Sequence, residues 1–145
     1  MKYYCVIISF MGFCVASCKL TNDSVQNQNV IYEACELADK INDTIVVRGT
    51  YSTCMEYSSF NPVKSDECYD AFDMDLRFNQ AHFTKEVEAR LDEMYGCGVS
   101  IKLTLRGILR KEKDRKYGHL GSNTAEFDVL DFIEYGKVKF KKLKN

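Results

Sequence analysis

Two glycines lie inside the strongest β-strand patterns of this 145-residue chain. Residues 47–51 read VRGTY and residues 105–109 read LRGIL, each within a longer run of alternating apolar and polar residues. Glycine weakens a strand interior, so it is used where the strand bends sharply or another backbone comes close. A small closed barrel needs such bends, because its strongly coiled strands take part in both of its faces. The two glycines therefore favour a small barrel.

The order of the predicted elements points the same way. Alternation predicts five strands, at residues 45–51, 55–60, 72–78, 99–105 and 125–134. Helical spacing predicts a helix over residues 84–96 between the third and fourth strands, and an extra N-terminal helix over residues 30–41. This order is that of the OB-fold. We expect a mainly β (α+β) domain with an OB-like five-stranded antiparallel barrel; the alternative is an open antiparallel sheet with the helices on one face.

The N-terminus carries an export signal. Met1 and Lys2 precede an apolar run over residues 3–15, which is too short to cross the ~30 Å hydrocarbon core of a bilayer as a helix. The run ends in VASC at residues 15–18, which resembles the lipobox of bacterial lipoproteins. This resemblance implies a signal peptide over residues 1–17 and an acylated Cys18, carrying a palmitate-type anchor, as the first residue of the mature protein.

Three other interpretations of the N-terminus stay open. An ordinary signal peptide would be cut after Ser17 or Cys18 and would release a plain secreted domain. In the second interpretation, the apolar run stays in the mature protein as a membrane segment. Two N-glycosylation sequons, at residues 22–24 and 42–44, leave a eukaryotic secreted domain as the third.

The mature chain is long enough for one domain. Removal of residues 1–17 leaves 128 of the 145 residues and changes the net charge from −1 to −2, because only Lys2 is lost. Residues 18–29 are polar and suit a flexible tether, and residues 30–145 form the predicted domain. Lys19 stands where some lipoproteins carry an aspartate that retains them in the inner membrane. We therefore expect an anchor in the bacterial cell envelope, at the outer membrane.

Export also divides the seven cysteines into two groups. Two leave with the signal peptide and Cys18 takes the lipid, which leaves Cys35, Cys54, Cys68 and Cys97. An even number in an oxidising compartment predicts two disulfides, with three connectivities possible. A zinc site is disfavoured because no two cysteines have C-x-x-C spacing and the histidines stand alone. We expect no metal and no cofactor.

OB barrels usually bind through their second and third strands and the neighbouring loops. On this chain that surface would use Arg48, Tyr51, Tyr57, Phe60 and Arg77. Aromatic residues beside arginines could stack nucleic-acid bases, but six acidic residues in the same region would repel phosphates: Glu56, Asp66, Glu67, Asp70, Asp73 and Asp75. We therefore expect a protein, peptide, glycan or small-ligand partner rather than a nucleic acid.

Residues 117–121 read YGHLG and are the most site-like segment. Two glycines beside His119 could present its ring for acid, base or ligand chemistry. The competing interpretation is structural: the glycines make a turn before the last strand, and Tyr117 packs on the barrel. One histidine without a nucleophile or a second ligand is no catalytic set, so the sequence predicts no enzyme.

These features together resemble small exported bacterial lipoproteins that have an OB-like domain. The resemblance implies a fold and a location, and it implies no activity or substrate. The function expected from the sequence is therefore a lipid-anchored, non-catalytic binding or envelope-associated module. A small exported hydrolase or isomerase using His119 is the alternative.

Overall fold

The computed structural model describes residues 30–66, 68 and 72–141. The predicted signal peptide, Cys18 and the tether lie outside these residues. No helix in the described part has the length and apolar character needed to cross a membrane.

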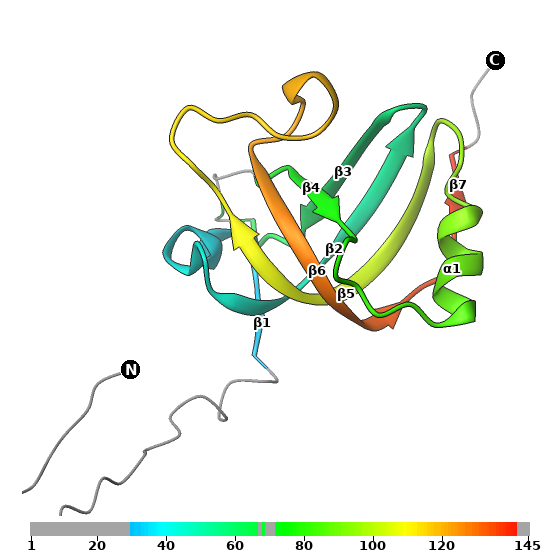
Figure 1. Cartoon of the computed structure of the whole chain (residues 1–145), viewed down its shortest axis with the longest axis horizontal. Coiled ribbons are helices and arrows are strands. Elements are labelled where there is room, and N and C mark those ends of the chain that lie inside the picture. Colours follow the sequence, from blue (N-terminus) through cyan, green and yellow to red (C-terminus); the bar gives the residue numbers. More distant parts are fainter. Residues whose placement is uncertain (1–29, 67, 69–71, 142–145) are drawn as a thin grey trace, which may run out of the picture.

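Within the described residues, five strands close into a barrel (Figure 1). They are β2 (Thr44–Cys54), β3 (Tyr57–Pro62), β4 (Met74–Arg77), β6 (Ala125–Tyr135) and β5 (Val99–Arg110), given in their order around the barrel. Pairing of β2 with β5 completes the closure. The pairs are antiparallel, except that β4 and β6 run parallel. The predicted mainly β barrel is confirmed and the open sheet is not formed, but the prediction that the barrel is antiparallel throughout is wrong, because β4 and β6 run parallel.

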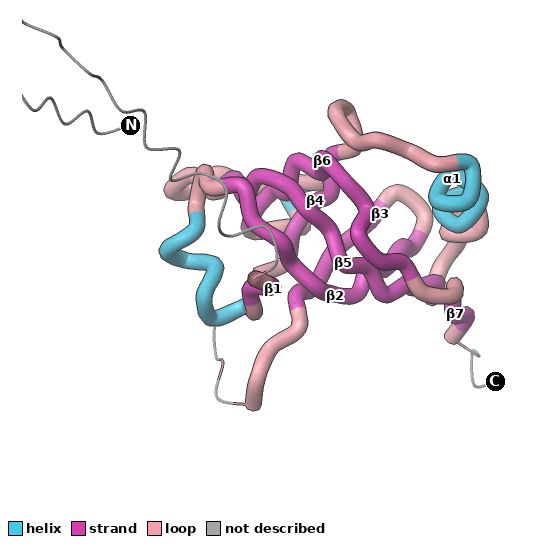
Figure 2. The backbone as a smooth tube through the Cα atoms, turned by 90° about the horizontal axis from the view of Figure 1, so that it is seen from below, coloured by secondary structure: helices cyan, strands magenta, loops and turns pink. Residues whose placement is uncertain are grey.

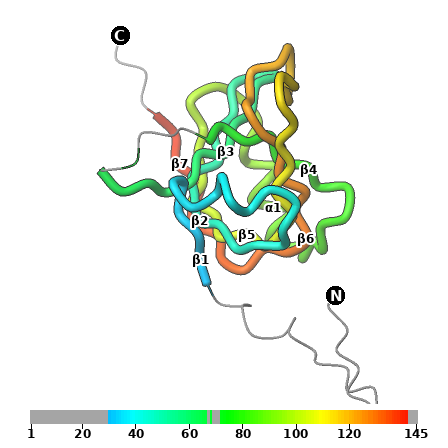
Figure 3. The backbone as a smooth tube through the Cα atoms, turned by 90° about the vertical axis from the view of Figure 1, so that its left-hand side faces the viewer, coloured from blue at the N-terminus to red at the C-terminus, as the bar shows by residue number. Residues whose placement is uncertain are grey.

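Two short strands extend the sheet beyond the barrel. At the N-terminus, β1 (Ile31–Tyr32) runs parallel to β2, as Figure 3 shows. At the C-terminus, β7 (Lys139–Phe140) pairs antiparallel with β5. The helices α1 (Lys85–Asp92) and η1 (Ala34–Lys40) lie at opposite ends of the barrel (Figure 2).

The N-terminal helix is shorter than predicted and has a different form. Instead of a helix over residues 30–41, the chain forms β1 and then η1, which is a 3₁₀ helix. Pairing of Ile31 with Val46 keeps the chain extended until Glu33, whose backbone N–H donates to the Glu36 carboxylate at 2.8 Å. Tertiary pairing thus overrides the local helical spacing.

The second helix also ends earlier than predicted. It begins after Thr84, whose hydroxyl accepts from the Val87 backbone N–H at 3.3 Å, and it ends at Asp92 rather than near Gly96. The Thr53 hydroxyl donates to the carbonyls of Met94 and Gly96, which holds the following segment on β2. Both carbonyl groups are therefore hydrogen-bonded to the barrel.

Each strand glycine permits a close backbone approach, as the sequence predicts. A Cβ atom on Gly49 would lie 2.5 Å from the Asn61 carbonyl oxygen, and one on Gly107 would collide with the Asp128 carbonyl. Pairing between β5 and β6 shifts register between Arg106 and Gly107. Both glycines therefore lie where the backbone of the neighbouring strand leaves no room for a Cβ atom.

The barrel interior is filled by large apolar side chains. Those under 2% exposed include Val47, Phe60, Met74, Leu105 and Phe127. Burying a side chain of this size contributes about 1.5–3 kcal/mol. The wall that carries the candidate site is therefore anchored to a packed core.

Two disulfides fasten segments to the barrel. They join Cys35 to Cys68 and Cys54 to Cys97, so all four predicted cysteines are paired and the connectivity is defined. In the chain-entropy model each bridge contributes about 4 kcal/mol for loops of this length.

Candidate functional site

The structure separates the seven candidate binding residues, which are the five of the predicted barrel surface together with Tyr117 and His119. Phe60 is fully buried in the core, so it does not belong to any surface. Tyr51 is half-buried against the core, and Arg48 lies on another part of the barrel wall. The rings of Tyr57 and His119 are in contact, while Arg77 and Tyr117 line a separate groove.

The contacts of His119 with Tyr57, at the start of β3, and with Glu56 join two segments that are far apart in sequence. The first is the turn of the β2–β3 hairpin, and the second is the β5–β6 loop over residues 111–124, which projects from the barrel in Figure 1. His119 Nε2 lies 3.1 Å from Glu56 Oε2. The Tyr57 and His119 rings meet edge to face, with their centroids 5.0 Å apart.

The β5–β6 loop has a backbone shape that its glycines allow. Tyr117 and Asn123 exchange two backbone hydrogen bonds, of 3.1 and 2.9 Å, which close the loop at its base. Gly118 has φ 70° and ψ −175°, a region that is essentially restricted to glycine, and a Cβ there would collide with Asn123 Nδ2. Gly118 and Gly121 both have positive φ in this turn, and Tyr117 is buried. The His119 side chain contacts the Glu56 carboxylate.

Asn123 fastens this loop to the barrel. Its side chain is 1% exposed and donates through Nδ2 to the Ser58 carbonyl oxygen on β3 at 2.9 Å. The loop that contains His119 is therefore attached directly to the hairpin by this hydrogen bond.

A cavity of about 370 Å³ lies between the hairpin and the β5–β6 loop, and we call it the hairpin–loop cleft. Hydroxyl side chains dominate its lining: Ser52, Thr53, Ser58, Ser59 and Ser122. Tyr57, Asn123 and Asp73 also face it, and Asp73 is the one charged lining residue among those described. The lining can donate and accept hydrogen bonds, and its charge disfavours polyanions.

A half-buried polar cluster lies behind the cleft. Burial raises the pKa of the Asp75 carboxyl, and the neighbouring Glu126 carboxylate raises it further. Burial also raises the pKa of the Tyr51 phenol. Ser58, which lines the cleft, lowers the pKa of both groups and so lies next to this cluster.

Two exposed apolar side chains mark the tips of the two loops. Met55 in the hairpin turn is 81% exposed, and Leu120 in the β5–β6 loop is 82% exposed. Both have positive φ, 55° and 53°, which is uncommon for residues other than glycine. Such conformations concentrate at ligand-binding segments, where surrounding structure maintains them.

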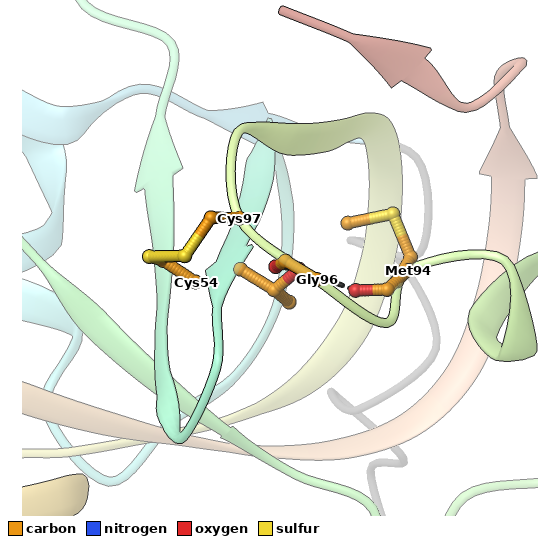
Figure 4. The surroundings of a disulfide bond; sticks show 5 residues. Cys54, Met94, Gly96 and Cys97 are labelled. Carbon is orange, nitrogen blue, oxygen red and sulfur yellow. Dashed lines mark hydrogen bonds between the residues drawn. A yellow bond between two sulfur atoms is a disulfide. The ribbon is translucent and has the colours of Figure 1, made fainter.

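One disulfide braces the hairpin side of the cleft. Cys54, which lines the cleft, is bonded to Cys97 in the α1–β5 connection. Figure 4 shows this bond beside the Met94 and Gly96 carbonyls that accept from Thr53. The hairpin is thus held close to its turn by a covalent bond and by hydrogen bonds.

The larger cavity, about 480 Å³, lies elsewhere on the barrel wall, and we call it the arginine groove. Its charged lining residues are Arg77, Arg110, Arg115, Glu112, Glu126 and Asp128. The sequence prediction included only Arg77 and Tyr117 of this groove. The others come from strand ends and loops that only barrel closure brings together.

Arg48 takes part in an ion pair outside both cavities. Its guanidinium lies 2.9 Å from Glu134, which also accepts from the Thr104 hydroxyl at 2.9 Å. The Thr104 hydrogen bond, followed by Arg48, lowers the pKa of Glu134. Arg48 therefore makes contacts between strands on the barrel wall.

No group of three or more histidine, cysteine or acidic side chains is placed to hold a metal ion within the described residues. Comparisons with protein families, with curated proteins and with solved structures found no match to this chain. The functional argument therefore rests on the geometry of the cleft and the groove.

Proposed function

We propose that this chain is a lipid-anchored exported protein, acylated at Cys18, that works in the bacterial cell envelope at the outer membrane. The two disulfides support export, because disulfides persist in oxidising compartments. The intact mass of the native protein tests the anchor. Acylation requires an N-terminus at Cys18 with added acyl mass, and an unmodified N-terminus would overturn it.

The barrel is OB-like in this proposal. The support is its strand order, β2-β3-β4-β6-β5 closing onto β2, with α1 between β4 and β5 and the parallel pair β4–β6. In an OB-like barrel the hairpin after the first strand and the loop before the last strand flank the ligand face. These are the two segments that meet at Glu56 and His119.

The function supported best is non-catalytic binding in the hairpin–loop cleft. The meeting of the hairpin with the β5–β6 loop carries this proposal, because Tyr57 and Ser58 on one side and Ser122 and Asn123 on the other line one polar cleft. The contacts of His119 with Glu56 and Tyr57 join the same two segments. The partner is a protein or peptide segment that is uncharged or basic, since Asp73 lines the cleft and Glu56 directly precedes the lining residue Tyr57 in the sequence. Repulsion from these carboxylates makes nucleic acid an unfavourable ligand.

Site-specific crosslinking in cells tests the binding role. A photoreactive residue at Ser122, which is exposed and lines the cleft, is compared with one at Glu88, which is exposed on α1. We expect a discrete adduct from position 122 only, lost in Asp73→Lys and retained in Asp73→Asn. Equal adducts from both positions, or none from position 122, would overturn the role.

A second candidate is an exported hydrolase or isomerase centred on His119. The observation favouring it is the 3.1 Å contact with Glu56, because a carboxylate can orient a histidine that acts as acid or base. Turnover of a panel of nitrophenyl esters tests it. Turnover lost in His119→Gln and retained in His82→Gln would establish the enzyme and would overturn the non-catalytic proposal.

A further inference from the structure

The arginine groove shares no lining residue with the hairpin–loop cleft. Its volume of about 480 Å³ falls within the range of small-ligand sites. We propose that it binds a short, uncharged oligosaccharide. This goes beyond the binding role of the cleft and does not depend on it.

The lining has the chemistry of polyhydroxyl recognition. Three guanidiniums and three carboxylates face the groove, and Asn42, Asn79 and Gln80 add three amides. All nine end in planar groups with two or more polar atoms side by side. Such groups can engage two adjacent hydroxyls of a sugar at once, by the fork geometry that suits bidentate contacts.

The charges in the groove balance and are already paired. Arg77 lies 3.3 Å from Glu126, Arg110 lies 3.2 Å from Asp128, and Arg115 lies 2.6 Å from Glu112. An anionic ligand would have to compete with these carboxylates, and a cationic ligand with the guanidiniums. A neutral polyol can bind without displacing either a carboxylate or a guanidinium from its partner.

Hydrogen-bonding capacity remains for such a ligand. A guanidinium has five N–H donors, and the described bonds engage one nitrogen of Arg77 and of Arg115 and two of Arg110. Within the described part of the chain, the exposed amides of Asn79 and Gln80 form no hydrogen bond. These groups can bind sugar hydroxyls without breaking a contact of the barrel.

The groove is also preorganised. Arg110 is held from two sides, by Asp128 and by Asn42, whose Oδ1 accepts from Nη1 at 3.0 Å. Buried Tyr117 accepts from the Glu112 backbone N–H at 2.9 Å, and the Arg115 guanidinium lies 5.0 Å from its ring centroid. Fixed polar groups lose little conformational entropy on binding, which favours affinity.

Calorimetric titration of the full-length protein in detergent tests the proposal. The uncharged probes are chitotetraose, cellotetraose and maltotetraose, and the charged probes are inorganic phosphate and spermidine. We expect at least one tetrasaccharide to bind more tightly than either charged probe. Arg110→Ala should weaken that binding by about tenfold or more, as expected for loss of hydrogen bonds from a charged group.

Two further variants separate recognition from stability. Arg106→Ala is the matched control, because Arg106 is also on β5 and paired with an acid, Asp131, but does not line the groove. It should leave the affinity unchanged. The double variant Asn79→Ala/Gln80→Ala removes only side chains without described contacts, and it should weaken binding about threefold or more.

Three results would overturn the proposal. The first is no binding of any of the three tetrasaccharides. The second is tighter binding of phosphate or spermidine than of every tetrasaccharide. The third is sugar binding that Asn79→Ala/Gln80→Ala leaves unchanged, which would place the sugar elsewhere even if Arg110→Ala fails to fold.

Discussion

Glu56 Oε2 and His119 Nε2 lie 3.1 Å apart, one on the β2–β3 hairpin and the other on the β5–β6 loop. Both side chains stay accessible, with 76% and 38% of their surface exposed. An exposed pair of this kind contributes at most about 1 kcal/mol to stability. The pair therefore links the hairpin to the loop without adding much to the stability of the barrel.

Phe60 and Tyr57 should respond differently to truncation, although both belong to β3. Phe60→Ala should lower the free energy of unfolding by about 3–5 kcal/mol, because Phe60 is fully buried in the core. Tyr57→Ala should cost under about 1 kcal/mol, since the side chain is 46% exposed. Urea unfolding measures both, and equal losses would contradict this division of the strand.

Asn123→Ala should cost about 1–3 kcal/mol and loosen the β5–β6 loop, because it removes the buried hydrogen bond to the Ser58 carbonyl. Hydrogen exchange of residues 117–123 should accelerate while the core strands stay protected. Asn61→Ala removes an exposed amide that contacts Ser59 and is the control, with an effect within about 0.5 kcal/mol. Unchanged loop exchange in Asn123→Ala would argue against the fastening role.

Gly118→Ala should destabilise by about 1–3 kcal/mol, because its backbone lies in a glycine-only region and a Cβ would collide with Asn123. Gly136→Ala is a suitable comparison. A Cβ there would meet the Lys102 carbonyl oxygen at 3.4 Å, which is close to ordinary contact. Thermal unfolding should separate the variants, and equal midpoints would contradict the proposed strain.

Asp75→Asn should raise stability at neutral pH. The pKa of Asp75 is raised above its ordinary value of 3.8, first by burial and then by Glu126, so the folded protein disfavours the charged form. This group's contribution is most favourable below its unfolded pKa and is lost as the pH rises through the folded value. Urea unfolding at pH 7 and pH 3 measures the gain, which should be present at pH 7 and shrink at pH 3. An equal gain in stability at pH 7 and at pH 3 would show that the raised pKa of Asp75 is not the cause.

Local pattern predicted the elements well because strand alternation and helical spacing belong to consecutive residues. The strands of the barrel occur where the sequence places them, and Gly49 and Gly107 lie at close backbone approaches. Element ends were predicted less well. Pairing of Ile31 with β2 shortened the first helix, and Thr53 with the Cys54–Cys97 bond held the residues after Asp92 on the barrel.

The candidate site was predictable only in part, because side chains from distant segments meet through barrel closure. His119 and Tyr57 were expected to matter separately, and the fold brings them into contact. Phe60 was expected on the surface, but strand β3 turns it inward, where it packs in the core. Arg110 and Arg115 had no distinguishing local pattern and became neighbours of Arg77 only in three dimensions.

The sequence by itself determined that the chain forms a small barrel and that four cysteines pair, since alternation, glycine placement and cysteine number are local or countable properties. Only the tertiary structure decided that Cys35 pairs with Cys68 and Cys54 with Cys97. It also decided which aromatic residues fill the core and which polar residues share a cavity. The physical reason is that strand register and closure place side chains together through contacts between residues distant in sequence, which no short stretch of sequence specifies.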